Sequence, residues 1–312
     1  MKKLLLIVVS AAMLFVACGG TKLISLARPT FDKHYMSKET TEALAQKPPR
    51  AMSFTLEDEK TDSLPYANSC AAWFDENSVQ LKAMTYHDGF EMMPLRNMKV
   101  ETPWISKYKT YSTKTKTYSL AHVVEQDHVV LFFYGDPPNE FRVINNVSVL
   151  VIRDKLSEGI KLALDFNEFA FPPEYAEKVK EYVFEDLLWA YVDNEMLYVS
   201  HAHWTYSNTT NDQNGYITAI SLKDKKIIWR SAPKVANAIN FIVIEDMIVS
   251  AYGYTREGAK LFAMDKKTGK ITGELTLAEP RSGKKHIEFL YNSGNQVFLK
   301  AFDNTAYKVK FQ

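Results

Sequence analysis

The sequence predicts an all-β protein, a β-propeller built from four-stranded antiparallel blades. Three observations lead to this prediction. A unit of apolar strand, short acidic or Asn-rich turn and second apolar strand recurs five times along the chain. A second hairpin follows three of these copies. The interval between copies matches the length of a propeller blade.

The spacing of the copies sets the size of the repeating unit. Their turns begin at Asp75, Glu125, Asp193, Glu245 and Asn292, at intervals of 50, 68, 52 and 47 residues. The second hairpins lie in residues 147–166, 215–231 and 258–276. A sheet this small that is apolar on both faces must bury both against neighbours, which radial stacking achieves. Five copies predict about five blades, or six if residues 50–118 contain another.

Two irregularities in the repeat have structural interpretations. After the last copy only "NTAYKVKFQ" remains, which supplies a third strand and no fourth. We therefore expect "AMSFTLED" at 51–58 to close the last blade. The longest interval contains "PPEYAEKVKEYVFE", whose apolar residues recur at helical spacing after two prolines. This predicts an inserted surface helix at 173–185, either decorative or part of a binding face.

The N-terminus has the composition of an export signal. Residues 1–17 combine Lys2 and Lys3, an apolar run and the small residue Ala17. The end of this segment, together with the next residue, reads "LFVAC" (14–18) and resembles the lipobox of bacterial lipoproteins. This predicts that Cys18 is lipidated, for example with palmitate. The alternative is an ordinary secretory signal with a chance cysteine. Acyl chains anchor a protein without spanning the bilayer, so we expect a tether at 18–50 and the propeller domain at 51–312.

Charge and cysteine content exclude several function classes. The chain has 38 basic and 37 acidic residues, so no basic field is available to attract nucleic acid. Apart from the lipidated Cys18, Cys70 is the single cysteine of the mature chain and cannot form an internal disulfide. Its apolar surroundings favour a buried, inert thiol over a nucleophile.

The hairpins "GYITAISLKDKKIIW" and "AKLFAMDKKTGKITGEL" resemble the repeat of the quinoprotein-like β-propeller family, the pyrroloquinoline-quinone (PQQ)-type repeat. Gly215 and Trp229 match in one hairpin, and Asp265 and Gly269 in the other. The resemblance implies structural roles: Asp265 accepts hydrogen bonds from turn N–H groups, Gly269 supplies a positive φ, and Trp229 packs between blades. None of these residues binds a cofactor through the motif.

The family that the hairpins resemble includes both enzymes and non-enzymatic proteins. Quinone-dependent dehydrogenases of the family carry a vicinal cysteine pair, which this chain lacks, so no cofactor is expected. Non-enzymatic envelope lipoproteins of the family, such as the barrel-assembly scaffold lipoprotein, are similar in anchor and repeat. They imply a scaffold function.

Two groups of residues are candidates for a site. His201 and His203 in "SHAHW" alternate on a strand and share a face, so they are weak candidates for a metal, against packed histidines as the alternative. "HWTYSNTTNDQNG" places aromatic residues beside amides and an acid in a long loop, which suits sugars or peptides. The candidate ligand contacts are Trp204, Tyr206, Asn208 and Asp212.

These observations predict a lipid-anchored envelope β-propeller, at the outer membrane and facing the periplasm, that binds a protein or glycan partner without catalysis. No Ser/His/Asp order, phosphate-binding glycine loop or helical His-Glu-x-x-His occurs in the sequence. One alternative is a glycan hydrolase or lyase with an axial site, because propeller sites are assembled from residues distant in sequence. A remote alternative is a quinone-dependent dehydrogenase.

Overall fold

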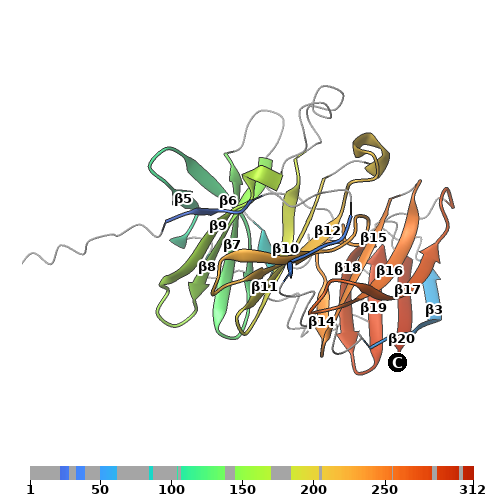
Figure 1. The fold of residues 1–312 in the computed structure, drawn as a ribbon. Coiled ribbons are helices and arrows are strands. Elements are labelled where there is room, and N and C mark those ends of the chain that lie inside the picture. Colours follow the sequence, from blue (N-terminus) through green and yellow to red (C-terminus); the bar gives the residue numbers. More distant parts are fainter. Residues whose placement is uncertain are drawn as a thin grey trace, which may run out of the picture.

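The computed structural model describes most of the chain from residue 22 onward. The described ranges are 22–27, 33–38, 50–61, 84–86, 104, 107–137, 145–169, 184–203, 206–254, 256–282, 287–301 and 305–312. Apart from single helical residues at 38, 104 and 107, their regular structure consists of β-strands and two short 3-10 helices, and the strands form four curled sheets (Figure 1). The predicted all-β fold with four-stranded antiparallel blades is confirmed.

Three of the sheets contain four strands that follow one another in the chain. The first has β6 (Thr117–Glu125), β7 (Val129–Asp136), β8 (Asn145–Asp154) and β9 (Ile160–Asp165). The second has β10 (Asp186–Asp193), β11 (Met196–Ala202), β12 (Tyr216–Ser221) and β13 (Lys226–Arg230). The third has β14 (Ile242–Ile244), β15 (Met247–Tyr254), β16 (Gly258–Asp265) and β17 (Ile271–Ala278). Each strand pairs antiparallel with the next, so every blade is an up-and-down meander.

The fourth sheet combines both parts of the chain. It contains β18 (Ile287–Ser293), β19 (Gln296–Ala301), β20 (Thr305–Phe311) and β3 (Phe54–Thr61). β3 pairs antiparallel with β20, with Phe54 opposite Phe311, and lies beside it at the right of Figure 1. The N-terminal segment therefore supplies the fourth strand that the sequence analysis expects from 51–58.

The sheets pack face to face in chain order. One cluster of buried side chains joins the first three sheets and includes Phe133, Trp189 and Ile248. A second joins the third and fourth sheets through residues such as Leu261 and Leu299. Because β7 and β12 are buried on both faces, the blades have no independent core and each depends on its neighbours.

The segment expected to be a free tether instead follows the outer edges of the blades. β1 (Ile24–Ser25) pairs with β9 in the first sheet, and β2 (Tyr35–Met36) pairs with β13 in the second. The Met52 N–H then donates to the carbonyl oxygen of Thr272 in the third (3.4 Å), before β3 joins the fourth. Outer edge strands carry unpaired backbone groups. These pairings satisfy some of them, which explains the departure from a tether.

The first sheet is larger than a four-stranded blade. Besides β1, it includes β4 (Met84–Tyr86) and β5 (Thr110–Ser112), both antiparallel to β6. The first predicted copy of the repeat, at 70–83, lies outside the described residues, as do Cys18 and Cys70. The described part of the chain therefore contains four blades of the five or six predicted.

The predicted helix at 173–185 is wrong at its C-terminal end. Phe184 and Glu185 have no helical structure and lead directly into β10. Glu185 is buried, and its carboxylate is bound within the second sheet, so the chain must already have entered the sheet at this point. Residues 173–183 lie outside the described residues.

The repeat residues Trp229 and Gly269 come together between the second and third sheets. Trp229 is fully buried, and its indole N–H donates to the carbonyl oxygen of Lys266 (3.1 Å). Gly269 has φ +67°, and a Cβ at this position would lie 2.3 Å from the Trp229 ring. The glycine is thus required both by the turn and by the neighbouring tryptophan.

The other two repeat residues, Gly215 and Asp265, also lie at blade contacts and turns. Gly215 has φ +66°, and a Cβ would lie 2.6 Å from the ring of Tyr252 in the third sheet. At Asp265 the turn differs from expectation. The N–H groups of Thr268 and Gly269 donate to its main-chain carbonyl (3.3 and 2.8 Å). Its carboxylate Oδ1 is buried and accepts no hydrogen bond from the described residues. The main-chain carbonyl of Asp265 and the Thr268 hydroxyl, which accepts from the Lys270 N–H (3.1 Å), close the turn in place of the carboxylate.

Candidate functional site

The candidate site lies at one end of the second sheet, which we call the loop end. Because the strands are antiparallel, the start of β10, the end of β11, the start of β12 and the end of β13 meet there. Glu185, His201, Tyr216 and Arg230 occupy these four positions. The opposite end, the tip end, consists of the tight turns at 193–196 and 221–226.

Glu185 is the centre of a buried polar network at the loop end. Its Oε1 lies 3.2 Å from Nη2 of Arg230, and its Oε2 lies 2.9 Å from Nδ1 of His201. The side chains of all three residues are fully buried. The Arg230 guanidinium also lies 3.6 Å from the centre of the Tyr216 ring. A charge removed from water in this way requires a close partner of opposite charge.

The protonation state of His201 depends on its burial and on its hydrogen-bond partners. Burial lowers its pKa below the ordinary value, against the opposing effect of the Glu185 carboxylate. The neutral ring then donates from Nδ1 to Glu185, and its Nε2 accepts from the Thr218 hydroxyl (2.8 Å). Both ring nitrogens are therefore engaged within the sheet.

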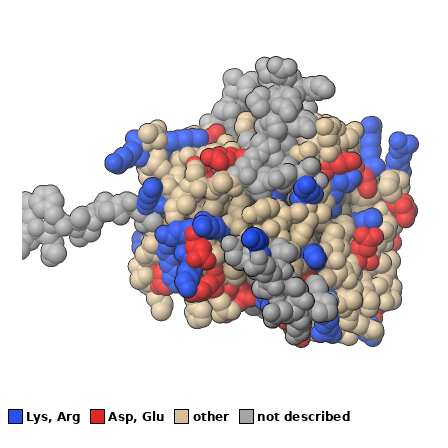
Figure 2. All heavy atoms as spheres, viewed as in Figure 1, with Lys and Arg blue, Asp and Glu red and all other residues tan. Residues whose placement is uncertain are grey.

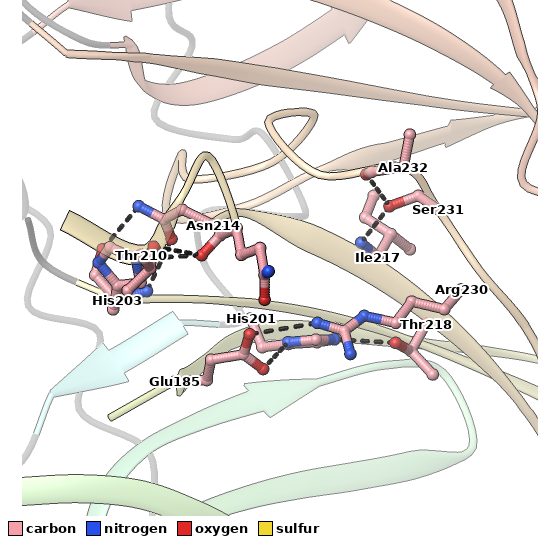
Figure 3. Close-up of polar contacts among 11 residues, drawn as sticks. Glu185, His201, His203, Thr210, Asn214, Ile217, Thr218, Arg230, Ser231 and Ala232 are labelled. Carbon is pink, nitrogen blue, oxygen red and sulfur yellow. Dashed lines mark hydrogen bonds and ion pairs between the residues drawn. The ribbon is translucent and has the colours of Figure 1, made fainter. Parts of the chain in front are cut away.

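His203 belongs to a different set of contacts, as Figure 3 shows. Its Nε2 lies 2.8 Å from the Thr210 hydroxyl, and its main-chain N–H donates to Oδ1 of Asn214 (2.9 Å). Burial lowers its pKa to about 4. His201 and His203, the weak metal candidates, thus contact different groups. Within the described ranges, no group of three or more His, Cys, Asp or Glu side chains is placed to hold a metal ion.

Residues 206–214, the 206–214 loop, form a compact structure above His203. A 3-10 helix (Ser207–Thr210) is followed by Asn211 and Asp212, which have φ of +51° and +62°. Short polar side chains such as these are the residues that tolerate the left-handed region. The loop therefore turns back tightly onto the sheet.

The 206–214 loop is also bound to the third sheet. Glu257, in the β15–β16 turn, accepts hydrogen bonds from the Ser207 N–H and hydroxyl (2.7 and 2.9 Å) and from the Tyr252 hydroxyl (2.7 Å). The Tyr254 hydroxyl donates to the carbonyl oxygen of His203 (3.1 Å). These contacts fix the loop across the boundary between two blades.

Three of the predicted ligand contacts lie in this loop. Tyr206 is half-buried and packs edge-on against Tyr254, with ring centres 5.6 Å apart. Asn208 is exposed. Asp212 is exposed, and its Oδ1 accepts from Nζ of Lys234 (3.2 Å) and lies 2.8 Å from the Ser207 hydroxyl oxygen, whose single proton is shared between Asp212 and Glu257. These two contacts lower the pKa of Asp212. The fourth candidate, Trp204, lies outside the described residues.

Four residues of the site were not predicted from the sequence: Glu185, Arg230, Lys234 and Glu257. Of these only Arg230 carries a signal, because it is a charged residue in the apolar alternation of β13. A charge on the buried face of a strand requires a partner. The partner cannot be read from the sequence because Glu185 lies 45 residues away.

The described residues contain no helix long and apolar enough to cross a membrane.

Comparisons with known proteins give no family. No family model and no curated protein matches the chain. Among solved structures, the computationally designed Ika8 protein is 10% identical with a TM-score of 0.38, covering 65% of this chain and 57% of that one. Glutaminyl cyclase from Myxococcus xanthus is 8% identical with a TM-score of 0.36, covering 85% and 99%. BamB from Moraxella catarrhalis is 10% identical with a TM-score of 0.30, covering 60% and 57%. At these scores, the fold assignment rests on the strand pairing of the chain itself.

Proposed function

We propose that this protein is a lipid-anchored component of the bacterial cell envelope that binds a protein or glycan partner through its loop end. The observation that carries the proposal is the construction of the 206–214 loop. Glu257 and Lys234 hold this loop in place, while Asn208 is exposed and Tyr206 is half-buried. A pre-organised loop loses little conformational entropy on binding, which favours recognition.

The chemistry of the loop supports binding rather than catalysis. The acid and the two histidines below it, Glu185, His201 and His203, are buried and engaged with one another or with neighbouring polar groups. The accessible groups are an amide, a phenol ring and a carboxylate. Such groups hydrogen-bond sugar hydroxyls or peptide groups and stack on apolar faces.

The lipid anchor and location are part of the proposal. They rest on the export signal at 1–17, the lipobox-like "LFVAC" and the similarity of the 215–231 and 258–276 hairpins to quinoprotein-like repeats. Non-enzymatic envelope lipoproteins of that family provide the precedent for a scaffold at the outer membrane. Labelling with radioactive palmitate tests the anchor. We expect incorporation in the natural protein and none in Cys18→Ala.

Affinity capture with matched variants tests the binding surface. Tagged protein is used to isolate partners from detergent-solubilised envelope, and glycan arrays are probed with the same preparations. We expect Tyr206→Ala/Asn208→Ala to lose the partner that the natural protein retains. Lys223→Ala/Lys226→Ala changes two exposed residues at the tip end and serves as the control.

The outcomes separate the proposed function from its alternative. Retention of every partner by the Tyr206→Ala/Asn208→Ala variant, with loss in the tip-end control, would assign binding to the other end. Cleavage of a bound glycan during the array experiment would replace the scaffold by a glycan-active enzyme.

A further inference from the structure

The position of the lipid relative to the blades follows from the way the N-terminal segment is bound. β1 pairs in parallel with β9, with Ile24 opposite Leu164 and Ser25 opposite Asp165. The Leu26 N–H also donates to the carbonyl oxygen of Asp165 (3.1 Å). The chain is therefore attached to the body from Ile24 onward.

The parallel direction determines which part of the first sheet is near the anchor. β9 runs from Ile160, beside the β8–β9 turn, to Asp165. Residues that precede Ile24 consequently approach the β9 strand from the side of this turn. Leu23 packs against the same apolar cluster as Ile160, which agrees with that direction.

The connection between the lipid and the body is short. Cys18 is six residues before Ile24, and a fully extended chain of this length spans at most about 20 Å. The four residue steps from Leu164 back to Ile160 already cover about 13 Å of β9. A lipid on Cys18 therefore places the membrane surface within reach of the β8–β9 turn.

The β8–β9 turn has the shape and composition for contact with lipid. Leu156 at its tip is 96% exposed. Asp154 holds the turn by accepting from the N–H groups of Leu156 (3.1 Å) and Ser157 (2.9 Å). An apolar side chain presented on a fixed turn is suited to insertion between lipid headgroups.

The lysines around the turn are paired with acids, and the Arg153 guanidinium lies against the Tyr108 ring (4.0 Å from its centre) and donates to the carbonyl oxygen of Glu158 (2.8 Å). Lys155 pairs with Glu125 (2.6 Å) and Lys161 with Asp154 (2.9 Å), and Lys107 pairs with Glu158. The face shown in Figure 2 likewise has basic and acidic side chains interspersed. Anionic lipids are therefore not needed to attract this edge of the protein.

We infer that the outer edge of the first blade, with Leu156 at its tip, faces the membrane, and that the fourth blade is directed away from it. The inference rests on the proposed lipid anchor. In Figure 1 the first and fourth sheets lie at opposite ends of the molecule. In this orientation the protein contacts the membrane through the outer edge of the first blade alone.

Site-specific fluorescence quenching tests this orientation. Full-length protein with Cys70→Ala is labelled with bimane at Leu156→Cys or, as the distant control, at Asn295→Cys in the exposed β18–β19 turn. Labelled protein is inserted into phosphatidylcholine vesicles that contain a headgroup-linked nitroxide lipid. Given the short connection, we expect at least about twofold more quenching at position 156 than at 295. Adding anionic lipid should leave this ratio unchanged.

A linker insertion provides the second measurement. About twenty Gly and Ser residues between Gly20 and Thr21 form a flexible connection and should reduce the quenching at position 156 toward that at 295. Equal quenching at both positions in the natural-length protein would overturn the orientation. Mass spectrometry of the same sample reports the lipid on Cys18: its absence would overturn the anchor as well, whereas equal quenching with the lipid present would overturn the orientation alone.

Discussion

The two ends of the second sheet each contain an ion pair, and the two pairs are differently built. At the loop end, Glu185 and Arg230 are 3.2 Å apart and their side chains are fully buried. At the tip end, Asp193 and Lys266 are closer, at 2.7 Å, but 28% and 15% exposed. Solvent access, rather than distance, determines what each pair contributes, because water replaces a lost partner only where it can enter.

Removing one partner from each pair should give the largest contrast. Glu185→Ala leaves the Arg230 guanidinium buried without its carboxylate, and we expect the free energy of unfolding to fall by about 3–5 kcal/mol. Asp193→Ala should cost about 1 kcal/mol or less. Urea unfolding followed by intrinsic tryptophan fluorescence measures both values. Equal losses would show that water replaces the lost partner at the loop end as easily as at the tip end, in contrast with the buried network described above.

Acidification should also destabilise the loop end. Burial lowers the pKa of His203 to about 4, whereas in the unfolded chain it is about 6.5. Below pH 6.5 the unfolded state binds a proton that the folded state does not, so stability falls as the pH decreases toward 4. A shift of this size corresponds to at most about 3 kcal/mol.

Unfolding midpoints measured between pH 7 and 4 check this contribution. The variant His203→Gln should have a smaller change over the interval than the natural protein. His128→Gln is the matched control, because His128 lies exposed in the β6–β7 turn, and it should leave the pH profile unchanged. The opposite ranking of the two variants would contradict the assignment to His203.

Two glycines with positive φ provide a test of how tightly the blades pack. The expected losses of unfolding free energy are intermediate between those of the other substitutions. Gly294 has φ +57°, and a Cβ added there would meet no atom within 4 Å, whereas a Cβ at Gly269 would lie 2.3 Å from the Trp229 ring. Gly294→Ala should cost about 1 kcal/mol from backbone strain alone. Gly269→Ala should cost about 1–3 kcal/mol more from overpacking. Thermal and urea unfolding of the pair measure the difference, and equal costs would mean that Trp229 moves freely.

The contrast between the two ends also explains which features were predictable from the sequence. Tight turns between neighbouring strands depend on residues close in the sequence, so Gly269 in the β16–β17 turn and Trp229 in β13 could each be assigned from a short repeat. The pairing of Glu185 with Arg230 depends on two segments 45 residues apart, and no local pattern specifies it. The same applies to β2, whose two residues join β13 through backbone groups. Backbone pairing of this kind is independent of side-chain alternation and leaves no sequence signal.

The smallest effect is expected at the β12–β13 turn of the tip end. There Asp224 accepts from the Ser221 hydroxyl (2.9 Å), and its N–H donates to the same hydroxyl oxygen (3.0 Å). Asp224→Ala removes the first contact and keeps the second. Asp224 is exposed, so water can replace much of the lost contact, and we expect a loss of about 0.5–1 kcal/mol in urea unfolding. Ser221→Ala removes both contacts and should cost more. If Asp224→Ala instead destabilised the protein as much as Glu185→Ala, the tip end would be as tightly determined as the loop end, and the difference between the two ends would not lie in burial.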